Sequence, residues 1–146
     1  MHVVGITGTR KLTESEVAKA TRELQLLLDK ATKLHVGDAA GIDALAHRCA
    51  STGIEVELHK TEGRKPYQLQ QRSKHMVDAL EKENGILHAF VNKPCPGGVT
   101  VNSWAGSGTW GTVRYAIAKG VPVELHWLIE PCELPDWIVE KQLTLI

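Results

Sequence analysis

Short apolar segments alternate along this chain with longer segments in which apolar residues recur every three or four positions. The short segments are rich in β-branched residues and are bounded by turn residues, which is typical of buried strands. They lie at residues 2–6, 33–36, 54–58, 86–91 and 121–125. The longer segments have the apolar spacing of helices that bury one face. They lie at about residues 14–31, 42–50, 68–83 and 109–119.

This alternation predicts an α/β fold. Strands that alternate with helices form a parallel sheet that is covered on both faces, with right-handed crossovers. We therefore expect a three-layer Rossmann-like domain with a mainly parallel sheet of five strands or slightly more. The chain of 146 residues suits one domain, 1–146, because chains of this size bury roughly two-thirds of their unfolded surface. Residues 126–146 are expected to pack, as a C-terminal tail, on the domain or on a dimer partner.

The composition narrows the partners and the location. Lys and Arg total 17, and Asp and Glu also total 17, so the chain has no net charge. A protein binds a long nucleic acid through many phosphate contacts, which basic side chains make. A chain without net charge has no general basic field for such contacts, so we expect no nucleic-acid partner. No apolar run approaches the ~20 residues that span a bilayer, so we expect no membrane partner. Three scattered cysteines without a CxxC pair favour a cytoplasmic setting.

Glycines gather at three of the turns that join a predicted strand to the next helix. These turns are residues 8–10, 37–43 and 106–109. In an open α/β sheet, ligands bind outside the carboxyl ends of the strands, where these turns lie. Glycine lets backbone amides approach an anion, and a helix N-terminus adds a favourable partial charge. A single glycine turn is ordinary between strand and helix, but three together predict a phosphate-binding loop and a ligand pocket.

Side chains in these turns suit a nucleotide. Arg10 presents a guanidinium that can fork onto a phosphate. Asp38 and Asp43 offer carboxylates, which suit ribose hydroxyls or a base edge better than phosphate. The Walker A pattern is absent, and the GxGxxG spacing at residues 106–111 follows the fourth predicted strand rather than the first. Neither P-loop hydrolysis nor the NAD fingerprint is therefore supported.

The histidines are candidate metal ligands, and the tryptophans are candidates for stacking on a base. Five of the seven histidines lie in or beside predicted strands without the spacing of a ligand motif, so we expect no metal site. Trp104 and Trp110 flank the last glycine turn, where an aromatic face could stack on a base. We favour a different role for these two rings, in which they pack against the tail or at a dimer interface.

Four segments carry a resemblance to a known superfamily. They are GITGTR, HVGDAAGIDALAHRCASTGIEVELH, RSKHMVDAL and GSGTWGTVRYAIAKGVPV, and the similarity covers about residues 3–123. These segments resemble the SLOG superfamily, and within it the small stand-alone YpsA-like members. The GID-A-AH segment is also similar to the DNA-processing protein DprA. The resemblance implies a Rossmann-like fold, a nucleotide or nucleotide-derived ligand, and a homodimer, which is common in the superfamily.

The expected pocket combines the three glycine turns with an arginine that the resemblance adds from the third predicted helix. Its residues are Gly8, Thr9, Arg10, Gly37, Asp38, Gly41, Asp43, Arg72, Gly106, Ser107, Gly108 and Thr109. Two departures from the superfamily bear on activity. LONELY GUY-type phosphoribohydrolases carry PGGxGTxxE, whose Glu serves catalysis, and that position here holds Thr112. In the YpsA-like group an Asn commonly follows the arginine, whereas Ser73 follows it here.

These observations favour a nucleotide-binding module without a catalytic residue, acting as a sensor, carrier or sequestering protein. We expect a nucleotide-type ligand, whose base and number of phosphates the sequence does not specify. The alternative is an enzyme that cleaves an N-glycosidic or phosphoribosyl bond, with Asp38 or Asp43 near the ribose. DprA-like binding of single-stranded DNA is a third hypothesis, against which the zero net charge argues. It would need a local patch from Lys60, Arg64, Lys65, Arg72 and Lys74.

Overall fold

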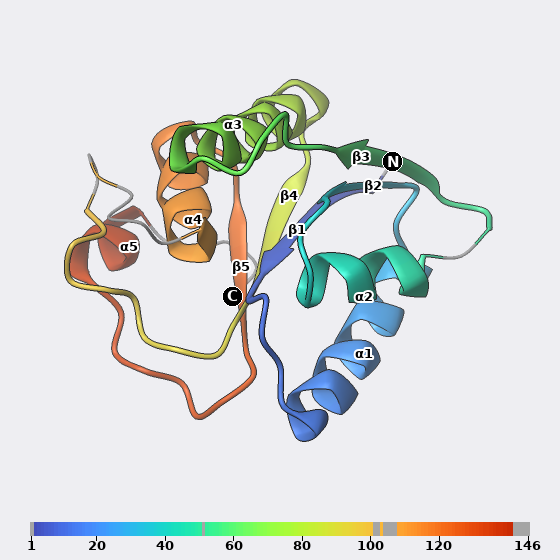
Figure 1. The fold of residues 1–146 in the computed structure, drawn as a ribbon, viewed down its shortest axis with the longest axis horizontal. Helices are drawn as coiled ribbons and strands as arrows, with labels where there is room; N and C mark the ends of the chain where they lie inside the picture. Colours follow the sequence, from blue (N-terminus) through green and yellow to red (C-terminus); the bar gives the residue numbers. More distant parts are fainter. Residues whose placement is uncertain (1, 51, 101–102, 104–107, 142–146) are drawn as a thin grey trace.

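The computed structural model describes residues 2–50, 52–100, 103 and 108–141, with side chains described as far as residue 138. It shows a five-stranded sheet in the order β3-β2-β1-β4-β5. All the neighbouring strands are parallel, which confirms the predicted α/β class (Figure 1). The strands are β1 (Val3–Gly8), β2 (Lys33–Gly37), β3 (Glu55–His59), β4 (Ile86–Val91) and β5 (Val123–Trp127).

Helices cover both faces of the sheet, so the domain has the three layers that the alternation predicts (Figure 1). Helices α1 and α2 lie on one face, and α3 and α4 lie on the other, with α5 against α4. The helices are α1 (Glu14–Asp29), α2 (Ile42–Cys49), α3 (Pro66–Glu83), α4 (Gly108–Ala118) and α5 (Asp136–Lys141). Among the described residues, no helix is both long enough and apolar enough to cross a membrane.

The strand order reverses at β1. The chain moves outward from β1 through β2 to β3, then crosses back to β4 on the other side of β1 and continues to β5. The loops after β1 and β4 therefore diverge at the carboxyl edge of the sheet, which is where ligands bind in folds of this kind. The backbone N–H of Thr9 donates to the Phe90 carbonyl at 3.2 Å, so the two strands stay paired up to this point.

Helix α1 begins where the sequence predicts it. Thr13 and Glu16 form a capping box, in which each side chain accepts a hydrogen bond from the other residue's backbone N–H. Such a cap contributes about 1 kcal/mol. Ala20, Leu24 and Leu28 follow at four-residue spacing and are buried against the sheet.

Two apolar clusters fill the space on either side of the sheet, and the strands contribute to them alternately. In β2, Leu34 and Val36 face the helices α1 and α2, so His35 between them points to the opposite face. In β4, Leu87 and Ala89 face α3 and α4, so His88 between them points toward α1. Both imidazoles are buried.

Several element boundaries differ from the predicted ones. Helix α3 begins at Pro66 rather than 68, because proline has the φ of a helix and needs no N–H partner in the first turn. Strand β5 begins at Val123 rather than 121 and extends to Trp127, so residues 126 and 127 belong to the sheet instead of the tail. The Val121 N–H still caps α4 by donating to the Ala116 carbonyl at 2.9 Å.

The described part of the tail lies against the domain. Ile138 of α5 is fully buried in the apolar cluster that α3 and α4 cover. Leu134 and Trp137 pack against the same cluster. Packing of the tail on a dimer partner stays a prediction.

Candidate functional site

A cavity of about 440 Å³ opens at the carboxyl ends of β1 and β4. Small-molecule sites commonly have volumes of ~300–1,000 Å³, so this one has the size of a small-ligand site. It is lined by residues within the segments 7–11, 66–73, 91–93 and 108–110, together with Ala39 and Asp43. The cavity therefore lies at the reversal of strand order, between the end of β1, the N-terminal half of α3 and the start of α4.

The turn after β1 is held in place by the start of α2. Gly8 lies against Ile42, and a Cβ added to Gly8 would come within 2.6 Å of the Ile42 side chain. Gly41 has a φ of 76°, and a Cβ there would collide with the backbone of Thr9 and Arg10. The Ile42 N–H donates to the Thr9 carbonyl at 3.1 Å. Gly8 and Gly41 thus allow this turn to pack closely on the start of α2, and Gly8 also lines the cavity, where the approach of its amide to an anion stays a prediction.

Asp38 is engaged by the protein and does not line the cavity. Its carboxylate accepts a hydrogen bond from Arg72 Nη1 at 2.8 Å and another from the Thr61 N–H at 3.2 Å. Burial acts to raise the pKa of Asp38, but these two hydrogen bonds and the Arg72 charge outweigh it, so the pKa lies below its usual value. The ion pair fixes Arg72 at the wall of the cavity.

Asp43 lines the cavity although it is only 5% exposed. Its carboxylate accepts a hydrogen bond from the Ala39 N–H at 3.2 Å. Burial raises the pKa of Asp43 to about 6, although the Ala39 N–H and the nearby Arg72 and Arg10 charges oppose the shift. A Cβ on Gly37 would lie 2.7 Å from Asp43 Oδ2, so glycine at this position is what allows the carboxylate its place.

Positive charge predominates around the cavity. Four cationic side chains line it, and Asp43 is the one carboxylate among its described lining residues. The cations are Arg10, Lys11, Arg72 and Lys93. Gly108, which begins α4, is exposed, and a Cβ on it would meet nothing within 4 Å. Helix N-termini attract anions, so the cavity suits a phosphate or another small anion.

Helix α4 contributes its first turn to the cavity and no acidic side chain. Gly108 and Thr109 line the cavity. Thr112, at the position of the catalytic Glu of the LONELY GUY pattern, is fully buried, and its hydroxyl donates to the Gly108 carbonyl at 2.6 Å. Trp110 is also fully buried, and its indole N–H donates to the Lys93 carbonyl at 3.2 Å. Trp110 thus packs in the core beside Trp127, with ring centroids 5.8 Å apart, at the wall of the cavity.

The structure brings together seven of the predicted pocket residues. Those that line the cavity are Gly8, Thr9, Arg10, Asp43, Arg72, Gly108 and Thr109. Gly37, Asp38 and Gly41 lie behind this lining and support it. Gly106, Ser107 and Trp104 fall outside the described residues.

Sequence reasoning missed part of the lining. Lys11, Asn92 and Lys93 belong to it, and the Asn92 side chain donates to the Lys11 carbonyl at 3.0 Å. These residues directly follow the predicted first and fourth strands. Their place at the carboxyl edge of the sheet could therefore have been predicted from the sequence. Ser73, which follows Arg72, also lines the cavity.

Histidines of neighbouring strands come close together in space, although their spacing along the sequence matches no ligand motif. His35, Glu57 and His59 place one ligand atom each within 4.8 Å of one another. His88, Glu124 and His126 do the same. None of these six residues lines the main cavity, although His59 lines a small neighbouring pocket together with Asp43 and Arg72.

No family model matches this sequence, and no curated protein matches it. Solved structures do match its fold. DNA processing protein A from Helicobacter pylori aligns with a TM-score of 0.60 at 12% sequence identity, over 85% of this chain and 64% of that chain. DprA from Streptococcus pneumoniae aligns with a TM-score of 0.60 at 16% identity, over 96% of this chain and 54% of that chain.

These likenesses show a shared Rossmann-like fold. This chain spans 64% and 54% of the lengths of the two proteins, so each of them contains further chain beyond the matched part. The structure from Helicobacter pylori is described in terms of its single-stranded DNA binding mode.

Proposed function

We propose that this chain binds a nucleotide, or a phosphorylated ligand derived from one, in the cavity at the carboxyl ends of β1 and β4. The observation that carries the proposal is a cavity of about 440 Å³ with four cationic side chains and the start of a helix around it. Membership of the SLOG superfamily, and of its YpsA-like group, is part of the same proposal. It is supported by the motifs and by the Rossmann-like fold. In this proposal the chain acts as a sensor, carrier or sequestering module.

The lining suggests how such a ligand lies. The phosphate is expected at Arg10 and the first turn of α4, because a guanidinium and a helix N-terminus line the same cavity there. The ribose and base then extend toward α3 and the start of α2, where Leu69 of α3 offers an apolar surface and Asp43 of α2 an acceptor for hydroxyl or amino groups. Arg72 is already paired with Asp38, so it contributes charge to the wall while its position is fixed.

Isothermal titration with a panel of mono-, di- and cyclic nucleotides tests the proposal. We expect micromolar or tighter binding of at least one nucleotide, and about tenfold weaker binding by Arg10→Ala, because a hydrogen bond to a charged group contributes ~1.5 kcal/mol or more. Arg48→Ala is the matched control, since Arg48 is exposed on α2 and does not line the cavity. Heats that stay at the dilution level across the whole panel would contradict the proposal, and so would equal losses in the two variants.

Cleavage of an N-glycosidic or phosphoribosyl bond is a second candidate function, favoured by one observation. Asp43 is a buried carboxyl beside the cavity, with a pKa of about 6, which suits proton transfer near neutral pH. Chromatography of the protein incubated with nucleoside monophosphates would detect free base. Release of base that Asp43→Asn abolishes would establish cleavage, and intact nucleotide in the wild-type incubation would exclude it for that panel.

Single-stranded DNA is a third candidate ligand, favoured by the fold shared with the Helicobacter pylori protein. The same four cations could contact the phosphate of an oligonucleotide instead of a free nucleotide. The two ligands differ in how salt affects binding, because a long polyanion makes many phosphate contacts and a nucleotide makes few. A comparison of salt dependence therefore separates them.

A further inference from the structure

The two outer strand pairs carry the same short pattern. On one side of β1, Leu34-His35 in β2 lies next to Glu57-Leu58-His59 in β3. On the other side, Leu87-His88 in β4 lies next to Glu124-Leu125-His126 in β5. The parallel register pairs His35 with Glu57 and His88 with Glu124. Because residues two apart on a strand share a face, each pairing gathers two imidazoles and a carboxylate.

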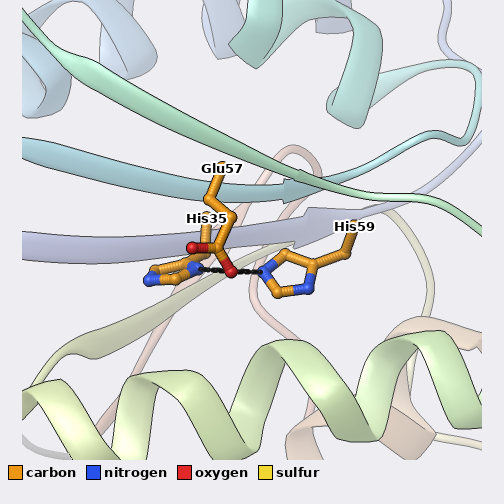
Figure 2. A group of neighbouring side chains, drawn as sticks. All are labelled: His35, Glu57 and His59. Carbon is orange, nitrogen blue, oxygen red and sulfur yellow. Dashed lines mark hydrogen bonds and ion pairs between the residues drawn. The ribbon is translucent and has the colours of Figure 1, made fainter.

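The group formed by His35, Glu57 and His59, called here the His35 cluster, lies at the edge of the sheet where α3 covers it. Figure 2 shows a carboxylate oxygen of Glu57 between the ring nitrogens of His35 and His59. Glu57 Oε2 lies 3.6 Å from His35 Nδ1 and 3.3 Å from His59 Nε2. The two ring nitrogens are 2.9 Å apart. Three electron-donating atoms thus converge on one point.

These distances fit a small, four-coordinate metal ion. Zinc takes imidazole nitrogen at ~2.0–2.1 Å and carboxylate oxygen at ~2.0–2.2 Å, so tetrahedral geometry places its ligand atoms ~3.3–3.5 Å apart. The three separations in the His35 cluster, 2.9, 3.3 and 3.6 Å, are distributed around that value. Two imidazoles and a carboxylate also form a donor set of catalytic zinc sites, which keep the fourth position for water. Calcium and magnesium prefer oxygen ligands, so the donor set disfavours them.

A second carboxylate orients the buried imidazole of the His35 cluster. His35 Nε2 lies 3.0 Å from Glu83 Oε1 at the end of α3. A carboxylate accepts hydrogen bonds, so this contact holds the proton on Nε2 and directs the Nδ1 lone pair at the point of convergence. Metal-bound histidines commonly have such a carboxylate on the other ring nitrogen.

Lys33 contacts one carboxylate oxygen of Glu57 and leaves the oxygen that faces the two histidines available. Lys33 Nζ lies 3.5 Å from Glu57 Oε1, whereas Oε2 is the oxygen that faces the two histidines. Lys33 also contacts Glu83 at 3.1 Å and so holds the outer carboxylate in place. The Glu57 side chain is 47% exposed, while His35 is fully buried, so an ion can enter from solvent at the edge strand.

We propose that His35, Glu57 and His59 bind a divalent transition-metal ion of the zinc class, with Glu83 as the outer partner of His35. In the metal-free protein, one proton on His59 Nε2 can serve both neighbours as a hydrogen-bond donor. When the ion accepts the Nε2 lone pair, that proton moves to Nδ1 of the same ring, so a neutral His59 binds the ion without net release of a proton. The bound ion links the edge strand β3 to β2.

The group formed by His88, Glu124 and His126, called here the His88 group, has the same donor set, and Glu23 Oε1 lies 3.3 Å from His126 Nδ1, so a variant at His126 tests which of the two groups binds the ion. It lies toward α1 on the opposite face, with His88 Nδ1 3.0 Å from His126 Nε2 and 3.3 Å from Glu124 Oε2. Phe90 stacks on the His126 ring with centroids 4.3 Å apart. A substitution of His126 therefore changes a comparable histidine without touching the His35 cluster.

Zinc titration of the whole chain, purified without a histidine tag and treated with chelator, tests the proposal. We expect micromolar or tighter Zn²⁺ binding by the wild type, at least tenfold weaker binding by His59→Gln and by Glu57→Gln, and wild-type affinity in His126→Gln. Both substituted side chains of the cluster are partly exposed, and circular dichroism checks that each variant is folded. Glu83→Gln is expected to weaken binding about tenfold, because it removes an outer partner and leaves the ligands.

Cobalt provides a readout of geometry. Co²⁺ added to the wild type and to His126→Gln should give the visible absorption of a four-coordinate ion, and His59→Gln should lose it. Three results would overturn the proposal: no tight Zn²⁺ binding by the wild type, unchanged affinity in both His59→Gln and Glu57→Gln, or an equal loss in His126→Gln. The nucleotide titration is independent of all three, since the cluster does not line the main cavity.

Discussion

At the scale of single residues, Asp38 and Asp43 show how position decides the chemistry of identical side chains. They are five positions apart in one segment, yet their pKa values shift in opposite directions. Asp38 has the Arg72 guanidinium at 2.8 Å, which favours its charged form. Asp43 is buried and accepts a hydrogen bond from the Ala39 N–H, and burial favours its neutral form.

We predict opposite effects of Asp43→Asn and Asp38→Asn on stability. Since the folded pKa of Asp43 is raised to about 6, its stabilising contribution is complete below about pH 4 and is lost as the pH rises through 6. Asp43→Asn should therefore raise the free energy of unfolding at pH 7.5 by roughly 2–3 kcal/mol, and this gain should shrink toward pH 4. Urea denaturation across this pH range measures it.

Asp38→Asn is the control of opposite sign. Its folded pKa is lowered, so its contribution is present above the ordinary carboxyl pKa and is lost as the pH falls below it. This variant should be less stable than the wild type at pH 7.5, with the loss fading in acid. A pH-independent effect in both variants would contradict the assignment of the two environments.

At the scale of elements, glycines with different surroundings separate local strain from packing. Gly41 has a positive φ, and a Cβ there would also collide with the turn after β1. Gly120 follows α4 with a φ of 77° and open space around its Cβ position. Gly53 has open space too, and its φ is not positive.

We predict that alanine lowers the free energy of unfolding most at Gly41, less at Gly120 and hardly at all at Gly53. Positive φ costs an alanine about 1 kcal/mol, and the backbone collision at Gly41 should bring the total there to roughly 2–3 kcal/mol. Thermal and urea denaturation of the three variants measure the order. Gly41→Ala should also weaken nucleotide binding, because it displaces the turn that carries Arg10. Equal losses of unfolding free energy in Gly41→Ala and Gly120→Ala would contradict this prediction, because they would show that the turn after β1 accommodates the added Cβ.

At the scale of the whole molecule, zero net charge and a cationic cavity occur together. The 17 basic and 17 acidic side chains cancel overall, but four of the basic ones gather around one cavity with a single described carboxylate. Such an arrangement can attract a small anion without a long-range basic field, because the helix start and the cations act over a few ångströms. The homodimer expected from the superfamily resemblance stays a prediction.

The salt dependence of binding should distinguish a nucleotide from DNA. Between 50 and 200 mM salt, a ligand that makes one or two phosphate contacts is expected to lose about tenfold or less in affinity. One that makes six to ten contacts loses roughly 10³–10⁵-fold. Titrations of a thymidine nucleotide and of an oligothymidine at both salt concentrations measure the slopes. Tighter and far more salt-sensitive binding of the oligothymidine would favour a DNA partner over the proposed nucleotide.

The order of the strands and helices along the chain could be predicted from local sequence patterns. Strand segments with β-branched residues, helix segments with periodic apolar residues, and the Thr13 cap are encoded by neighbours along the chain, so local patterns predict them. The placing of the glycine turns at one edge also follows from the sequence, since parallel strands bring their carboxyl ends together. Six of the proposed pocket residues line the observed cavity for this reason, and Arg72 of α3, which the resemblance adds, is the seventh.

Contacts between side chains of distant segments follow from the packing of helices on the sheet and from strand register. The pairing of Arg72 with Asp38 depends on how α3 lies over β2, and no local pattern specifies that packing. The His35 cluster depends on strand register, because a shift of one residue would turn Glu57 and His59 to the other face. Local backbone preferences act between neighbours in sequence, whereas register and packing are set by burial of the whole sheet. The His35 cluster and the Arg72–Asp38 pair depend on register and packing as well as on the local preferences that form the strands and helices.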